Sequence, residues 1–301
     1  MSSFVTLLRR EWLEARLPFL WLPLGALAFL VIVTLLGLAI SGFGDISITV
    51  SSSGDAATSI FIDNWTDREV AEHMTDFRTV VTAPFYVIYA VSALFVLLGA
   101  LYDDRKDRSV LFWKSMPVSD LETVASKYVL VIWIAPLVML ACALLAQIFL
   151  LLVGTSFIAA QDLGHPGRLW LHSGLIGGTV RMALGFLIQG LWVMPVAGFL
   201  LLVSATASRL TLLWALVVPI GASIAEYVIF RTQILSSEIN KHLEPAALPN
   251  FTGDDGRVMP VLTTIGQQLT LLISSDLWLG VLVGLAFLYA AVRMRSIKNE
   301  L

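Results

Sequence analysis

Six apolar runs constrain this chain most, because each is close to the length that crosses a lipid bilayer. A helix rises about 1.5 Å per residue, so roughly 20 apolar residues span about 30 Å of hydrocarbon. The runs have none of the alternation of barrel strands, and an open sheet would leave backbone groups unpaired in lipid. They therefore predict an all-α integral membrane protein with six transmembrane helices. The predicted spans are approximately residues 17–40, 82–101, 127–153, 182–204, 212–230 and 277–292.

The composition leads to the same class. Hydrophobic residues make up 57% of the 301 residues, charged residues only 14%, and the mean hydropathy is +0.84. These are too few polar residues to form the surface of a water-soluble globular protein of that size. The single cysteine, Cys142, excludes an intrachain disulfide and a cysteine metal cluster, and helix packing is its expected role.

Lysine and arginine are concentrated in the segments that would share one side of the membrane. The positive-inside rule therefore predicts a multi-pass protein of the bacterial cytoplasmic (inner) membrane, with both termini and the loop 102–126 in the cytoplasm. Residues 41–81, 154–181 and 231–276 are then predicted outer loops, the first of them acidic. The cations that set this orientation are Arg9, Arg10, Arg16, Arg105, Lys106, Arg108, Lys114, Lys127, Arg209, Arg293, Arg295 and Lys298.

Residues 1–16 show helical amphipathicity. An apolar face lies opposite most of the charged side chains, which predicts an amphipathic helix lying in the inner interface. A signal peptide is the rival interpretation, but the apolar run that follows is too long for its hydrophobic region. Residues 17–301 would then form the six-helix transmembrane domain. The apolar face consists of Phe4, Leu7, Leu8, Trp12 and Ala15.

Sequence signatures of enzymes are absent. The chain contains no G-x-x-x-x-G-K-[ST] phosphate loop, no H-E-x-x-H zinc pair and no G-x-S-x-G nucleophile turn. Its four histidines are scattered through predicted loops, so we expect no metal site. The chain is thus predicted to be no enzyme and to bind no cofactor of its own.

The predicted spans contain one carboxylate, Glu226, and two side-chain amides, Gln147 and Gln189. Polar groups in a bilayer are expensive and often functional, which makes these residues candidates for a substrate contact or a gate. A structural interpretation competes with this one. Glu226 lies near the outer end of its span and close to Arg231, and the glutamines can join helices by hydrogen bonds.

Residues 103–120, DDRKDRSVLFWKSMPVSD, combine positive charge with two large apolar anchors, Phe112 and Trp113. A short helix before Pro117 would present them to a soluble partner. Ser119 and Glu122 form a capping-box pattern, which predicts a new helix that continues into the third span. An interfacial helix anchored in lipid headgroups is the alternative.

Residues 101–127, LYDDRKDRSVLFWKSMPVSDLETVASK, resemble the loop after the second transmembrane helix of ABC-2 type permeases, the membrane subunits of one exporter class of ATP-binding cassette transporters. The overall plan of the chain is similar to that family as well. The large acidic first outer loop departs from many compact members and leaves the substrate open.

The resemblance implies a permease that works with two separate cytoplasmic ATPase subunits, which would bind ATP and Mg²⁺. It also implies a second permease subunit, identical or homologous, contact with membrane lipid and no nucleic acid. The coupling to the ATPase would be carried by Asp107, Arg108, Val110, Leu111, Phe112, Trp113, Lys114, Met116 and Pro117.

The function expected on these grounds is ATP-driven transport, more specifically export of a hydrophobic, amphipathic or peptide-like compound. Two alternatives remain open at this point. A motor-independent channel or carrier would need a polar lining, which the spans do not show. A membrane signalling component would place its ligand site in the acidic outer loop.

Overall fold

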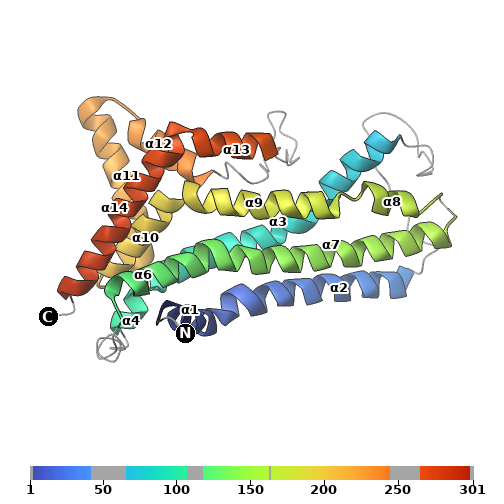
Figure 1. The fold of residues 1–301 in the computed structure, drawn as a ribbon, viewed down its shortest axis with the longest axis horizontal. Coiled ribbons are helices and arrows are strands. Elements are labelled where there is room, and N and C mark those ends of the chain that lie inside the picture. The colour runs from blue at the N-terminus through green and yellow to red at the C-terminus, as the bar shows by residue number, and fades with distance from the viewer. Residues whose placement is uncertain (1–2, 42–65, 107–117, 163, 245–264, 299–301) are drawn as a thin grey trace.

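The computed structural model describes residues 3–41, 66–106, 118–162, 164–244 and 265–298. Throughout these ranges the regular elements are helices, and no strand occurs among them (Figure 1). Six helices are long and apolar enough to cross a membrane, which confirms the predicted all-α class with six candidate spans. These helices extend over Leu17–Ile40, Asp67–Lys106, Asp120–Ala160, Gly167–Trp192, Thr211–Phe230 and Ser275–Ile297.

The first part of the chain contains α1 (Ser3–Glu14), the π-helical turn η1 (Leu17–Trp21), α2 (Leu22–Ser41), α3 (Asp67–Gly99) and α4 (Tyr102–Lys106). The N-terminus of α3 is closed by a capping box in which Thr66 and Glu69 bond to each other's backbone N–H groups, at 3.3 and 2.7 Å. The helix then continues through Pro84 without a break. The second span is therefore the later part of one 33-residue helix.

The middle of the chain contains α6 (Asp120–Val129), the π-helical turn η3 (Leu130–Ile134), α7 (Ala135–Ala160), α8 (Gly167–His172), α9 (Leu175–Trp192) and α10 (Met194–Thr206). The predicted fourth span, residues 182–204, falls on two of these helices, which meet at Val193. Pro195 in the first turn of α10 accounts for the break, because proline donates no backbone hydrogen bond and its ring displaces the carbonyl four residues earlier.

The last part of the chain contains α11 (Thr211–Phe230), α12 (Ile234–Leu243), α13 (Ile265–Ile273) and α14 (Ser275–Lys298). Two short helices, α12 and α13, thus lie in the segment expected to be a polar outer loop. His242 of α12 is buried and stacks on Trp192, with ring centroids 5.1 Å apart. This histidine is therefore part of the fold and not a solvated loop residue.

The helices form two groups in Figure 1. The long helices α2, α3, α7 and α9 pack along one another, whereas α10, α11 and α14 are inclined to them at one end of the bundle. A continuous core of buried side chains, including Leu97, Met139 and Leu201, joins the groups. Large apolar side chains remain exposed on α2, α11 and α14, as on a surface that contacts lipid.

Glycines allow α10 and α14 to approach at their backbones. A Cβ atom at Gly198 would lie 2.8 Å from the carbonyl oxygen of Gly284, and one at Gly284 would lie 2.7 Å from the backbone of Met194. A Cβ at Gly280 would overlap the His242 ring. The Gly280-x-x-x-Gly284 pattern in the sequence therefore marks a close helix contact.

Candidate functional site

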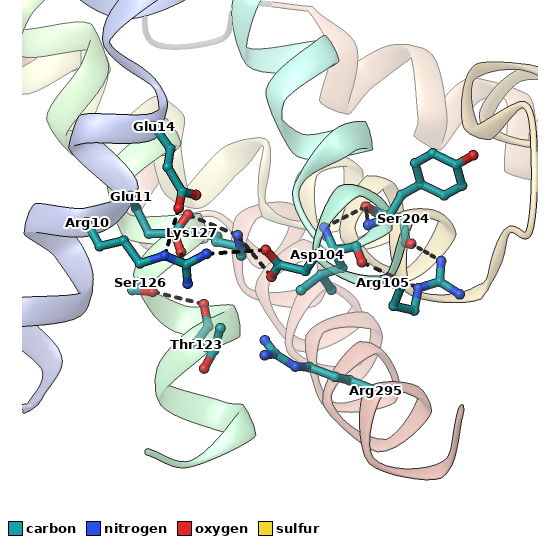
Figure 2. Close-up of polar contacts among 12 residues, drawn as sticks. Arg10, Glu11, Glu14, Asp104, Arg105, Thr123, Ser126, Lys127, Ser204 and Arg295 are labelled. Atoms are coloured by element: carbon teal, nitrogen blue, oxygen red, sulfur yellow. Dashed lines mark hydrogen bonds and ion pairs between the residues drawn. The ribbon is translucent and has the colours of Figure 1, made fainter. Parts of the chain in front are cut away.

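The nine residues predicted to couple the chain to an ATPase, from Asp107 to Pro117, lie outside the described residues. The structure describes both flanks of this segment, which we call the 107–117 segment. On one side α4 ends at Lys106, and on the other side α6 begins at Asp120. The candidate site is the set of polar contacts that hold these two flanks, drawn in Figure 2.

The predicted capping box after the segment is confirmed. The Ser119 hydroxyl accepts from the Glu122 N–H at 3.1 Å, and a Glu122 carboxylate oxygen accepts from the Ser119 N–H at 3.0 Å. Two of the N–H groups that a helix start leaves unpaired are therefore satisfied. The chain that leaves the 107–117 segment thus enters α6 with a fixed direction.

Four charged residues form what we call the ion cluster: Arg10 and Glu11 of α1, Asp104 of α4 and Lys127 of α6 (Figure 2). Lys127 Nζ lies 2.9 Å from Glu11 Oε2 and 3.3 Å from Asp104 Oδ2. Arg10 Nη2 lies 3.5 Å from Asp104 Oδ1. The cluster joins the N-terminal helix to both flanks of the 107–117 segment.

The ion cluster is buried and balanced in charge. The exposed fractions are 5% for Glu11, 7% for Asp104 and 4% for Lys127. Two cations face the two buried carboxylates, so each charge removed from solvent has an opposite charge close by, and Arg10 Nε also pairs with the exposed Glu14 at 2.7 Å. Burial raises the pKa of the Glu11 carboxyl above its ordinary value, and the Lys127 ammonium acts against that shift.

A second set of bonds ties the near flank to α10. The Ser204 hydroxyl accepts from the backbone N–H groups of Leu101 at 2.9 Å and Tyr102 at 3.0 Å, where α3 gives way to α4. Arg105 Nη2 donates to the carbonyls of Ser204 at 2.6 Å and Ala207 at 2.8 Å. The last carbonyl groups of a helix have no partner within the helix, and here the Arg105 guanidinium donates to them and complements the negative end of the helix dipole.

The far flank is tied to the last helix. Asp120, the first residue of α6, pairs with Arg295 of α14, with Nε and Oδ1 3.1 Å apart. Arg295 is only 5% exposed. Helices α1, α10 and α14 are thus all connected by buried or partly buried polar contacts to the flanks of the 107–117 segment.

The three candidate residues inside the spans lie on separate helices, and two of them have identified structural partners. Glu226 of α11 accepts from the Thr232 hydroxyl at 2.7 Å and from the N–H groups of Ile234 and Leu235 at 2.9 Å, so it caps the start of α12. This carboxylate has backbone partners in place of the expected pairing with Arg231.

Gln147 of α7 joins two helices. Its amide nitrogen donates to the Thr82 hydroxyl at 2.8 Å and to the Arg78 carbonyl at 3.3 Å, both on α3. Gln189 is buried in α9. Together with Glu226 on α11, the three residues come from three helices, and the contacts of Glu226 and Gln147 serve helix capping and helix packing.

Sequence reasoning missed the carboxylates of the ion cluster. One available signal is the spacing of Leu7, Glu11 and Ala15, which share a helix face, because an acid between two apolar residues on that face needs a buried cation. Asp104 has no comparable signal. Its position depends on the break between α3 and α4, which the apolar pattern does not predict.

Comparison with known proteins supports a family. A family model described as ABC-2 family transporter protein matches residues 74–164, a stretch that includes most of α3, the 107–117 segment, α6 and α7. No curated protein and no solved structure matches the chain. The family match agrees with the resemblance noted at residues 101–127, and the likeness of residues 74–164 supports an ABC-2 type permease.

Proposed function

We propose that this permease is the membrane subunit of an ATP-driven exporter of a hydrophobic, amphipathic or peptide-like compound. Two cytoplasmic ATPase subunits would bind ATP and Mg²⁺, and a second permease subunit, identical or homologous, would complete the assembly. In this proposal the chain lies in the bacterial cytoplasmic membrane with both termini in the cytoplasm. The 107–117 segment is the contact with the ATPase.

The observation that carries the proposal is the attachment of both flanks of the 107–117 segment to other helices. Lys127 pairs with Glu11 of α1 and Asp104 with Arg10 of α1, and Asp120 joins the far flank to α14. A displacement of the segment would therefore be passed to helices far away in the sequence. A segment that only rested in lipid headgroups would need no such set of attachments.

The proposed cycle uses this attachment. Binding of ATP closes the two ATPase subunits, which push on the 107–117 segment and change the equilibrium between inward-facing and outward-facing arrangements of the spans. Only contacts that differ between the two arrangements can shift that equilibrium. The ion cluster is the described feature best placed to make or break such contacts.

The decisive experiment uses the double variant Phe112→Ala with Trp113→Ala. Loss of a buried aromatic anchor at an interface costs about 2 kcal/mol or more, roughly a thirtyfold change in association. We expect a tagged variant in mild detergent to lose its co-purifying ATPase while it still inserts into the membrane. Trp170→Ala is the matched control, since Trp170 lies on α8 at the other end of the bundle (Figure 1).

Unchanged co-purification and ATP-driven transport in the double variant would refute this assignment of the 107–117 segment. Transport that persists without any ATPase would favour a motor-independent channel or carrier.

The orientation has a test of its own. In a Cys142→Ala background, Asp63→Cys should react with an impermeant thiol reagent in intact cells, and Lys114→Cys should not. Reaction at position 114 would reverse the predicted orientation.

A further inference from the structure

A second buried charge lies away from the ion cluster, at Arg78 of α3. The residue is 6% exposed, and its Nη1 donates to the carbonyl oxygen of Gly174. Its Nε is buried without a hydrogen-bond acceptor. Among the described residues, no carboxylate lies within ion-pair distance of the guanidinium.

A second arginine adds to this positive charge. Arg181 of α9 is close enough to Arg78 for the two charges to repel each other, and it too has no ion pair within the described ranges. Two neighbouring cations without a carboxylate, one of them buried, form an environment that strongly favours an anion.

The Arg78 guanidinium lines a cleft between α3, α7 and α9. The cleft itself is small, with a cavity volume of about 20 Å³, and it opens into a wider space of about 350 Å³ that includes the surroundings. One part of its wall is polar, with Thr79, Thr82 and Gln147, and another part is apolar, with Leu140 and Leu144. Such a wall matches a molecule that has a charged group and a hydrocarbon part.

The start of α9 is shaped around this guanidinium. A Cβ atom at Gly178 would overlap it, and a Cβ at Gly174 would lie 3.0 Å from Nη1. Gly174 also has φ +57°, which favours glycine. Both glycines therefore leave room for the Arg78 side chain beside the backbone of α9.

Gln147 has a positioning role in the cleft. Both of the acceptors of its amide nitrogen, the Arg78 carbonyl and the Thr82 hydroxyl, belong to α3. Its amide donors are thus engaged in holding α7 to α3 beside Arg78. The guanidinium is the group left to donate to a ligand.

We propose that this cleft binds the phosphate or carboxylate group of an amphipathic molecule, with Arg78 as the anion contact and Leu140 and Leu144 against the hydrocarbon part. The anion can belong to a membrane lipid or to a diffusible acidic amphiphile. The proposal does not depend on the coupling to an ATPase, because binding is measured on the permease alone.

The test measures binding of dodecyl phosphate to the purified permease in detergent, with Arg78→Gln and Gly178→Ala as variants. The first removes the charge, and the second keeps the charge but displaces the guanidinium. Charge-assisted, fork-like hydrogen bonds are the strong ones, so we expect Kd to rise at least about tenfold in both variants. Arg68→Gln is the matched control, because Arg68 is on the same helix but exposed and paired with Glu72.

Two further measurements identify the source of the anion. Preferential retention of phosphatidylglycerol over phosphatidylcholine in nanodiscs, lost in Arg78→Gln, would identify a lipid headgroup. Binding of dodecyl phosphate without any preference between these lipids would identify a diffusible amphiphile.

Three results would overturn the proposal. The first is equal affinity of the wild type and both variants for dodecyl phosphate. The second is equal affinity of the wild type for dodecyl phosphate and for the uncharged dodecyl maltoside. The third is binding that occurs only after Asp45→Asn, Asp55→Asn and Asp63→Asn, which would assign the guanidinium to carboxylates of the chain itself. If Arg78→Gln does not fold, Gly178→Ala and Arg78→Lys carry the comparison.

Discussion

The ion cluster and the Arg78 cleft are both buried charged sites, but they differ in pairing. In the ion cluster, Lys127 lies within 3.3 Å of two carboxylates from two other helices. In the cleft, Arg78 has a backbone carbonyl as its hydrogen-bond acceptor, and its charged neighbour is another cation. The comparison separates charges that join helices from a charge that is available to a ligand. Four predictions test it, from the largest expected effect to the smallest.

Lys127→Met should destabilise the protein most. The substitution leaves Glu11 and Asp104 buried with Arg10 as their neighbouring cation, and removing one partner of a buried pair costs about 3–5 kcal/mol. The free energy of unfolding, measured in detergent by denaturant titration, should fall by that amount. Lys241→Met is the control, since Lys241 is partly exposed and its loss should cost about 1 kcal/mol or less. Equal losses in the two variants would show that the ion cluster does not hold the helices.

Ser204→Ala should have the next largest effect. It leaves the N–H groups of Leu101 and Tyr102 without their side-chain acceptor at the break between α3 and α4. A buried donor left unsatisfied costs about 1–3 kcal/mol. The thermal midpoint should drop, whereas Ser156→Ala, at a serine that bonds within its own helix, should change little. A larger loss in Ser156→Ala would contradict the role of Ser204.

Arg78→Met should leave the free energy of unfolding unchanged or raise it, whereas Lys127→Met should lower it. The apolar side chain removes a buried charge that has no carboxylate partner, and such replacements are often neutral or stabilising. In ligand-free detergent we expect the free energy of unfolding to stay within about 1 kcal/mol of the wild type or to rise. A loss as large as that of Lys127→Met would mean that Arg78 is paired after all, and the contrast between the two sites would fail.

The smallest expected effect is on the pH dependence of folding stability, through the Glu11 carboxyl. Because burial raises the pKa of Glu11 above its ordinary value of 4.5, protonation of this carboxyl stabilises the folded state below that value. The contribution is lost as pH rises through the raised folded-state pKa. Glu11→Gln cannot titrate, so its stability should fall less than that of the wild type between pH 4.5 and neutrality. Identical pH profiles would show that Glu11 does not titrate in this window.

The features that depend on local sequence could be predicted well. Apolar runs are visible in the local sequence, and the all-α class with six candidate spans among the described residues is confirmed, although the predicted fourth span falls on two helices. The Ser119 capping box also needs only residues close in sequence, and it is confirmed as well. Pro195 predicts a bend in the span 182–204, and the structure has a full break at Val193 between α9 and α10.

The long-range partners of charged side chains could not be predicted. Glu11 and Lys127 are 116 residues apart, and their pairing depends on how α1 lies against α6. Arg78 looked like one more cation of a predicted outer loop, and only the packing of α9 around it reveals a buried site. Helix packing and not helix formation therefore limited the site prediction.

The glycine contact between α10 and α14 has a consequence for how motion could spread. At Gly198 and Gly284 the two backbones meet without an intervening side chain, so no rotamer change can absorb relative sliding. The same two helices carry Ser204 and Arg295, the attachments to the two flanks of the 107–117 segment. Helices α10 and α14 should therefore move as one rigid unit. A force on either attachment should tilt both helices together.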